Sequence, residues 1–196
     1  AEIRRLHEGL PGSVLLVLDA AYAEYVQRGD YEPGAELVNH FDNVVMTRTF
    51  SKIYALAGLR VGWAFCPPAV ADAFNRLRGA FNVSMPAQRA AVAALLDREH
   101  VAQSVAHNTE WKNWLTDRIR ATGITVGESE GNFLLLQFRA PYQAEAADTF
   151  LTERGLILRP VANYHLPHCL RLTIGTAEAN RGVAVALADF MREDGS

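Results

Sequence analysis

Residues 44–63 read VVMTRTFSKIYALAGLRVGW, and this stretch decides the fold. Its apolar, β-branched beginning predicts a buried strand over residues 44–48. Two hydroxyls, an amine and a guanidinium follow that strand, from Thr49, Ser51, Lys52 and Arg60. Hydroxyls and a guanidinium beyond a strand suit a phosphate group, and they leave the lysine amine free to attack an aldehyde. The stretch therefore predicts a phosphate site beside a reactive amine.

A second strand-like segment also ends in polar groups. Residues 15–22 read LLVLDAAY, in which the apolar run predicts a strand of a parallel sheet covered on both faces. The run ends at Asp19, and Tyr22 follows three positions later. Taken alone, Asp19 could equally cap a following helix, and Tyr22 could serve only for packing. The roles of Asp19 and Tyr22 depend on which residues lie beside them in the fold.

Composition excludes several classes of protein. The chain has 196 residues, 49% hydrophobic and 21% charged, as in an ordinary globular protein. Its net charge of −3 gives no basis for nucleic acid or an anionic membrane as a partner. No apolar run has the length of a membrane span, and the six histidines show no metal-ligand spacing. Cys66 and Cys169 lie in apolar segments, which indicates buried reduced thiols, so we expect a cytoplasmic protein without a metal site.

Alternating strands and helices predict an α/β chain. Strands are expected at residues 14–19, 44–48, 61–66, 124–128, 132–138, 157–160 and 169–174, and helices at 1–9, 69–78, 144–153 and 178–192. Residues 87–121 are helical in pattern but too long for one unkinked helix. We place a domain boundary near residue 120, so that residues 1–120 hold part of a large sheet domain with its linking helix. Residues 121–196 then form a small C-terminal domain.

One arginine of the second half lies in a strongly apolar strand. In CLRLTI, residues 169–174, strand alternation puts the leucines on one face and Arg171 on the other. A guanidinium in such a strand is costly unless it is paired, so we expect Arg171 to face a cleft where an anion binds. Arg159 is a second candidate of this kind, although a plain salt bridge explains it equally well. Asn132 could line the same cleft.

The segments around Asp19 and Lys52 together resemble the fold-type I pyridoxal-phosphate enzymes, and within them the histidinol-phosphate aminotransferase family. The resemblance lies in the strings DAAY at residues 19–22, TFSK at 49–52 and GLRVG at 58–62. It implies a fold-type I α/β architecture: part of the large domain with its parallel-rich sheet, plus a small C-terminal α/β domain. It also implies pyridoxal 5′-phosphate as the cofactor.

The resemblance further implies a role for each polar residue of these segments. Lys52 matches the lysine that carries the cofactor covalently, and we expect it to be partly buried beside the cationic Arg60, which favours the neutral, nucleophilic amine. Asp19 matches the aspartate that keeps the cofactor's ring nitrogen protonated. Tyr22 matches the tyrosine that hydrogen-bonds the ring oxygen. The matches to the phosphate ligands are Ser51, Arg60 and, less closely, Thr49.

Substrates and assembly are implied in the same way. In aminotransferases the arginine of this small-domain strand binds the substrate's carboxylate or phosphate, which assigns Arg171, with Arg159 and Asn132 as further candidates. An amino donor and a 2-oxoacid are the implied partners, most closely histidinol phosphate and 2-oxoglutarate in histidine biosynthesis, within a homodimer. A pyridoxal-phosphate-dependent decarboxylase of a phosphorylated amino acid would use the same cofactor residues, so it stays an alternative.

The resemblance begins only at the middle of the family's sequences. We therefore expect the chain to correspond to the C-terminal half of such an enzyme. In the family, the aromatic residue stacked on the cofactor ring and the backbone amides that complete the phosphate site lie in the other half. The chain alone should then expose sheet edges and apolar faces, bind the cofactor weakly and transaminate nothing. A catalytically inert fragment is the third alternative.

Overall fold

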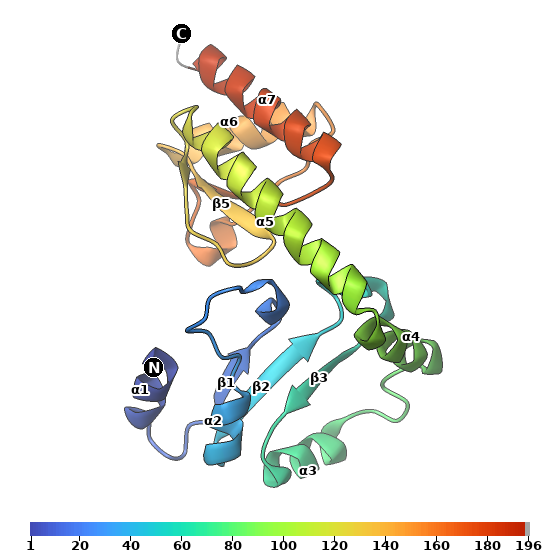
Figure 1. Ribbon diagram of the computed structural model, residues 1–196. Coiled ribbons are helices and arrows are strands. Elements are labelled where there is room, and N and C mark those ends of the chain that lie inside the picture. Colours follow the sequence, from blue (N-terminus) through green and yellow to red (C-terminus); the bar gives the residue numbers. More distant parts are fainter. Residues whose placement is uncertain (195–196) are drawn as a thin grey trace. The chain divides into compact units, whose positions relative to one another are not determined.

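The computed structural model describes residues 1–194, which form two compact units (Figure 1). The first unit is Ala1–Gln103 and the second begins at Ser104, so the division falls inside the long helix α5 (Arg98–Arg120). Leu115 and Ile119 of α5 are fully buried in the core of the second unit. Most of the linking helix α5 thus belongs to the second unit. The expected boundary near residue 120 stays a prediction for the whole protein.

The first unit contains a three-stranded sheet in the order β1-β2-β3. Its strands are β1 (Leu16–Asp19), β2 (Val44–Thr49) and β3 (Gly62–Phe65). β1 runs parallel to β2 with Asp19 opposite Thr47, and β3 runs antiparallel to β2 with Gly62 opposite Thr49. A Cβ atom at Gly62 would lie 2.7 Å from the Arg48 carbonyl oxygen, so this close approach of β3 requires glycine. The ends of β1 and β2 and the beginning of β3 therefore lie at one edge of the sheet.

The burial of this sheet differs in part from the prediction. β2 is buried as expected, since Val44, Val45 and Met46 are at most 2% exposed. β1 was expected to be covered on both faces, and this is wrong: Leu16 and Leu18 pack toward α2 (Ala35–His40), whereas Val17 on the other face is 53% exposed. All residues of β3 are exposed. The expectation of exposed apolar faces is thus confirmed.

The other α-helices of the first unit begin within two residues of the predicted positions. They are α1 (Glu2–Glu8), α3 (Pro68–Leu77) and α4 (Met85–Leu96), and the unit also contains the 3₁₀ turns η1 (Ala23–Tyr25) and η2 (Ala57–Leu59). The long helical stretch predicted over residues 87–121 is interrupted at Asp97, which separates α4 from α5. Ser84 caps α4, since its side chain accepts a hydrogen bond from the Ala87 amide at 3.3 Å.

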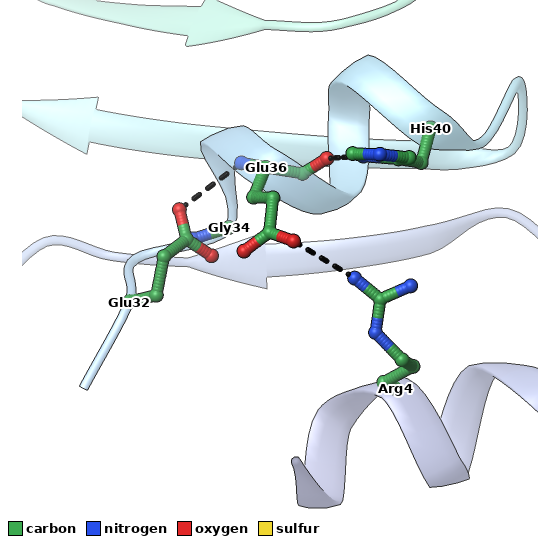
Figure 2. Close-up of polar contacts among 5 residues, drawn as sticks. All are labelled: Arg4, Glu32, Gly34, Glu36 and His40. Carbon is green, nitrogen blue, oxygen red and sulfur yellow. Dashed lines mark hydrogen bonds and ion pairs between the residues drawn. The ribbon is translucent and has the colours of Figure 1, made fainter. Parts of the chain in front are cut away.

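Charged side chains fix helix α2 (Figure 2). The Glu32 carboxylate accepts hydrogen bonds from the amides of Gly34 at 2.9 Å and Glu36 at 3.1 Å, and so satisfies free N–H groups at the beginning of the helix. Glu36 in turn pairs with Arg4 of α1 at 3.1 Å. His40 Nδ1 lies 2.7 Å from the Glu36 carbonyl oxygen. These contacts cap α2 and tie it to α1.

The second unit has an antiparallel sheet in the order β4-β5-β7-β6. Its elements are β4 (Thr125–Val126), β5 (Phe133–Gln137), α6 (Pro141–Thr152), β6 (Arg159–Pro160), η3 (Ala162–Tyr164), β7 (Cys169–Thr173) and α7 (Ala177–Asp194). Side chains from α5, α6 and α7 bury one face of the sheet, where Leu134, Leu136, Leu170 and Leu172 are at most 6% exposed. Arg171 alternates to the other face, as predicted.

Two further expectations concern the thiols and the membrane. Cys66 and Cys169 are both free; Cys169 is buried, whereas Cys66 is only half-buried. Among residues 1–194, no helix combines the length and the apolar character that crossing a membrane requires.

Helix α7 offers a matched test of this packing. Val183 is 2% exposed and lies in the core, whereas Val185 on the same helix is 62% exposed. Val183→Ala should lower the free energy of unfolding by about 1.5–3 kcal/mol, because it removes buried apolar surface and leaves a cavity. Val185→Ala should change it by less than about 0.5 kcal/mol. Urea denaturation followed by Trp111 and Trp114 fluorescence in a Trp63→Phe background measures both, and equal effects would refute the assigned core face.

Candidate functional site

The shared edge of β1 and β2 carries the first predicted site residue, Asp19. Its Oδ1 accepts hydrogen bonds from the Ala21 amide at 3.2 Å and from the Thr47 hydroxyl at 3.5 Å. The Ala20 amide donates to the Thr47 carbonyl oxygen at 3.0 Å and prolongs the strand pairing. Asp19 thus makes the local turn bond expected of a capping residue. Its carboxylate nevertheless stays exposed and can accept a further donor.

Lys52 and Tyr22 are brought together. The Lys52 Nζ lies 5.4 Å from the centre of the Tyr22 ring, within the range of a cation–π contact. The side chain of Lys52 is exposed, so the expectation of a partly buried lysine is wrong. The physical reason is local: the turn after β2 buries Phe50 and Ile53 and directs Lys52 outward. Burial therefore cannot be the cause of any reactivity of this amine in the chain.

Thr49, Ser51 and Arg60 form a second group of contacts. The Thr49 hydroxyl accepts a hydrogen bond from the Ser51 amide at 3.0 Å. The Arg60 Nη1 atom donates to the Ser51 hydroxyl at 3.5 Å and to the Ala57 carbonyl oxygen at 2.7 Å. Two hydroxyls and a guanidinium thus gather on one turn, a donor set that suits a phosphate. Of the two neighbouring glycines, only Gly62 is required by a close backbone approach.

The turn that carries these groups is strained and anchored. Ala55 and Arg60 both have the left-handed backbone conformation, with φ of 57° and 51°. Each such residue costs on the order of 1–3 kcal/mol, and strain of this kind clusters at functional sites. Phe50 and Ile53, 4% and 2% exposed, anchor the turn in the first unit. The anchors keep the polar groups of the turn in a defined arrangement.

A largely shielded ion pair joins η1 to β2 near the turn. Arg48 Nη2 lies 2.5 Å from Glu24 Oε1, and the two side chains are only 18% and 10% exposed. The Tyr54 phenol lies close enough to the Glu24 carboxylate for that charge to raise its pKa, and the Arg48 guanidinium lies 5.7 Å from the centre of the Trp63 ring. None of these residues was among the predicted site residues. An arginine within the apolar run of residues 44–49 was the available signal, by the reasoning that identified Arg171.

Two phenols near this pair have perturbed acidity. Burial raises the pKa of Tyr54 above its usual value, and the adjacent Glu24 carboxylate raises it further. Burial likewise raises the pKa of Tyr31, against the opposing effect of Arg48. Both neutral phenols therefore stabilise the folded state. That contribution is complete below tyrosine's usual pKa of about 10 and is lost as the pH rises through the raised value.

Alkaline unfolding tests the environment of Tyr54. Between about pH 9 and about pH 11, the free energy of unfolding should fall less in Tyr54→Phe than in the unchanged chain, because phenylalanine has no proton to lose beside Glu24. Urea denaturation followed by circular dichroism at each pH measures the difference. Tyr142→Phe, at a side chain that is 71% exposed, is the control and should behave like the unchanged chain. Identical falls in all three proteins would contradict the assignment.

The second unit places two of the predicted arginines side by side. Arg159 on β6 is the register partner of Arg171 on β7, and directly paired residues project from the same face of a sheet. Arg159 donates to the Tyr164 hydroxyl at 3.2 Å, and the Arg171 guanidinium lies 5.3 Å from the centre of the Phe133 ring. Like charges opposite each other are destabilising. A bound anion would remove that repulsion.

Two further features bear on this face. Arg171 Nε is buried and has no hydrogen-bond partner within the described part of the chain. Neither Arg171 nor Arg159 forms a salt bridge among residues 1–194, so the plain salt bridge weighed for Arg159 is not observed there. Asn132 lies directly before β5, where its carbonyl oxygen accepts a hydrogen bond from the Ile174 amide at 2.9 Å. That contact is structural, and a substrate role for Asn132 stays a prediction.

Comparison with known proteins identifies close relatives. The family model described as aminotransferase class I and II matches residues 2–187. The histidinol-phosphate aminotransferases of Rhodopseudomonas palustris (strain BisB18) and Nitrobacter hamburgensis are each 56% identical over 194 residues, which are 98% of this chain and 53% of the relative. The chain therefore spans about half the length of the curated relatives it matches.

A solved structure shares the fold. The histidinol-phosphate aminotransferase of Sinorhizobium meliloti, solved in complex with pyridoxal-5′-phosphate, matches with a TM-score of 0.89 and 28% identity. The match covers 98% of this chain and 53% of the solved chain.

Proposed function

The chain belongs to the class I and II aminotransferases, and we propose that the whole protein transfers an amino group between histidinol phosphate and a 2-oxoacid with pyridoxal 5′-phosphate as cofactor. Its fold is that of the fold-type I α/β enzymes, as expected from the sequence. The observation that carries the proposal is the pairing of the Lys52 amine with the Tyr22 phenol, next to the donor set of Ser51 and Arg60.

The residues at the edge of the first unit's sheet fit this cofactor. Arg60 and Ser51, with the Thr49 hydroxyl, would hold the phosphate, because a guanidinium and hydroxyls are the donors that phosphate oxygens take. The exposed Asp19 carboxylate would accept from the ring nitrogen, and the Tyr22 hydroxyl would reach the ring oxygen. The cofactor, when bound, supplies a conjugated ring that withdraws electrons from the substrate's Cα.

Each side chain then has a separate task. Asp19 would keep a proton on the ring nitrogen, because an adjacent carboxylate favours the charged form of a base. Lys52 would carry the cofactor covalently, and as a free amine it would take the proton from the substrate's Cα. Tyr22 lies beside Lys52 and orients it through its ring. Arg60 and Ser51 hold the phosphate through both half-reactions, and so fix the position of the reacting carbon relative to Lys52.

The arginine pair of the second unit supports the choice of an anionic substrate. Arg159 and Arg171 face the same side of their sheet, and a phosphate or carboxylate between them would satisfy both guanidinium groups. Both the amino donor and the 2-oxoacid are anions, so one site can serve them in turn. The relatives at 56% identity are histidinol-phosphate aminotransferases, which favours histidinol phosphate as the donor and a role in histidine biosynthesis. We further propose that the whole protein is a homodimer located in the cytoplasm.

The cofactor assignment can be tested on the chain itself, which has two lysines, Lys52 and Lys112. Lys112 is engaged elsewhere, because its Nζ donates to the Ser129 carbonyl oxygen at 2.7 Å. Treatment with excess pyridoxal 5′-phosphate and borohydride should therefore fix the label on the peptide that contains Lys52, and Lys52→Arg should lose it. Peptide mapping by mass spectrometry decides, and label mainly on Lys112 would end the proposal. Excess cofactor is needed because the chain spans only half of its relatives.

The substrate site can be tested without catalysis. Inorganic phosphate should bind the chain, and Arg171→Ala should weaken that binding by about 10- to 150-fold, equivalent to about 1.5–3 kcal/mol for a charge-assisted hydrogen bond. Arg139→Ala, at an exposed arginine of the same unit, is the control and should bind as before. Titration calorimetry measures the affinities. Equal phosphate affinity in all three proteins would remove Arg171 from the proposed site.

The decarboxylase alternative has a separate test. Release of carbon dioxide from a phosphorylated amino acid by the whole protein would favour it.

A further inference from the structure

The two site-bearing segments of the first unit separate after the paired strands end. Backbone pairing of β1 with β2 stops at Asp19 opposite Thr47, followed by one more bond from the Ala20 amide to the Thr47 carbonyl oxygen. From there the first segment turns into η1, which begins directly after Tyr22, and the second continues to Lys52. Side-chain contacts must therefore keep Tyr22 beside Lys52.

The contact between Lys52 and Tyr22 does not hold itself in place. Lys52 is exposed, and an exposed cation–π contact contributes only about 0.5–1 kcal/mol. A free lysine side chain has large rotamer entropy, which opposes a fixed position. The arrangement thus depends on a firmer link between the two segments.

The Glu24–Arg48 pair is such a link. Glu24 belongs to η1, two residues after Tyr22, whereas Arg48 belongs to β2, four residues before Lys52. Their 2.5 Å contact is shielded from water, with side chains 10% and 18% exposed. The 3₁₀ turn η1 fixes Tyr22 relative to Glu24, because the Tyr25 amide donates a hydrogen bond to the Tyr22 carbonyl oxygen at 3.0 Å.

Tyr54 brings the other side of the lysine to the same carboxylate. It lies two residues after Lys52, and its phenol is close enough to Glu24 for the carboxylate to raise the phenol's pKa. Its ring packs 5.0 Å from that of Phe50, which is 4% exposed. The Glu24 carboxylate therefore lies beside residues on both sides of Lys52 in the sequence, while its own segment carries Tyr22.

We propose that Glu24 is a positioning residue, which holds Tyr22 beside the Lys52 amine through its ion pair with Arg48. This inference deepens the proposed function, because Lys52 is the amine assigned to the cofactor. The carboxylate acts through geometry and touches neither substrate nor cofactor. Its loss would leave a buried guanidinium without a counter-ion, which drives Arg48 and the adjoining turn to rearrange.

The arrangement of Lys52 can be measured directly by NMR on the 196-residue chain. Labelling with ¹³C-lysine gives signals from Lys52 and Lys112 alone, because these are the only lysines in the sequence. The ring current of Tyr22 should change the chemical shifts of the Lys52 methylene groups. Tyr22→Leu should remove this displacement of the Lys52 signals and so identify it. Lys112 lies in the second unit and serves as the internal reference.

Glu24→Gln keeps the size of the side chain and removes its charge. We expect it to abolish most of the Tyr22-dependent displacement of Lys52 while circular dichroism stays unchanged. Glu36→Gln is the matched control: it breaks another glutamate–arginine pair of the same unit, whose side chains are 40% and 59% exposed, and should leave the Lys52 signals in place. Trapping of pyridoxal 5′-phosphate on Lys52 by borohydride should also slow in Glu24→Gln, by on the order of 10- to 100-fold.

An unchanged Lys52 displacement in folded Glu24→Gln would overturn the proposal and leave the pair a purely structural one. Should Glu24→Gln fail to fold, Arg48→Gln decides instead, because it removes the other charge of the ion pair and keeps the Glu24 carboxylate. Loss of the displacement there supports the proposal, and an unchanged displacement refutes it. The NMR result does not depend on the cofactor. A Glu24-dependent displacement with the label mainly on Lys112 would therefore refute the proposed function and leave the positioning role intact.

Discussion

The parallel pairing of β1 with β2 is the constraint on which the candidate site depends. Because Asp19 lies opposite Thr47, both strands end at one edge of the sheet, and the polar groups that follow them emerge there. The antiparallel strand β3 brings Arg60 to the same edge, which is possible because Gly62 has no Cβ to meet the Arg48 carbonyl oxygen. A register shift of one residue would turn Asp19 to the other face.

The site combines exposed reacting groups with a buried support. Lys52 and Asp19 are exposed, and Arg60 has a left-handed backbone that favours glycine. Such an arrangement persists only where surrounding contacts determine it. The Glu24–Arg48 pair supplies part of that support in a shielded position. An isolated buried pair adds little net stability, because the cost of desolvation offsets the attraction of the charges. In this chain the pair matters because it joins the segment that carries Tyr22 to the segment that carries Lys52.

The two units differ in how completely they bury their apolar surface. In the second unit, three helices close one face of the sheet over a continuous aliphatic core, and the other face carries the Arg159–Arg171 pair. The first unit leaves Val17 on β1 and Trp63 on β3 about half exposed, on opposite faces of its sheet. This exposure agrees with a chain that spans about half the length of its relatives, and with the expectation that the chain alone binds the cofactor weakly.

The sequence by itself predicted the elements, because hydrophobic period and turn residues act over short distances: the strands, a break somewhere within the long helical stretch of residues 87–121 and the face of Arg171. Its motifs also identified the family. The tertiary structure alone decided that Lys52 is exposed and that β1 is covered on one face only. It also decided that Glu24 meets Arg48 and that Arg159 lies opposite Arg171. These features depend on which distant segments pair and in what register, and no local pattern of residues carries that information.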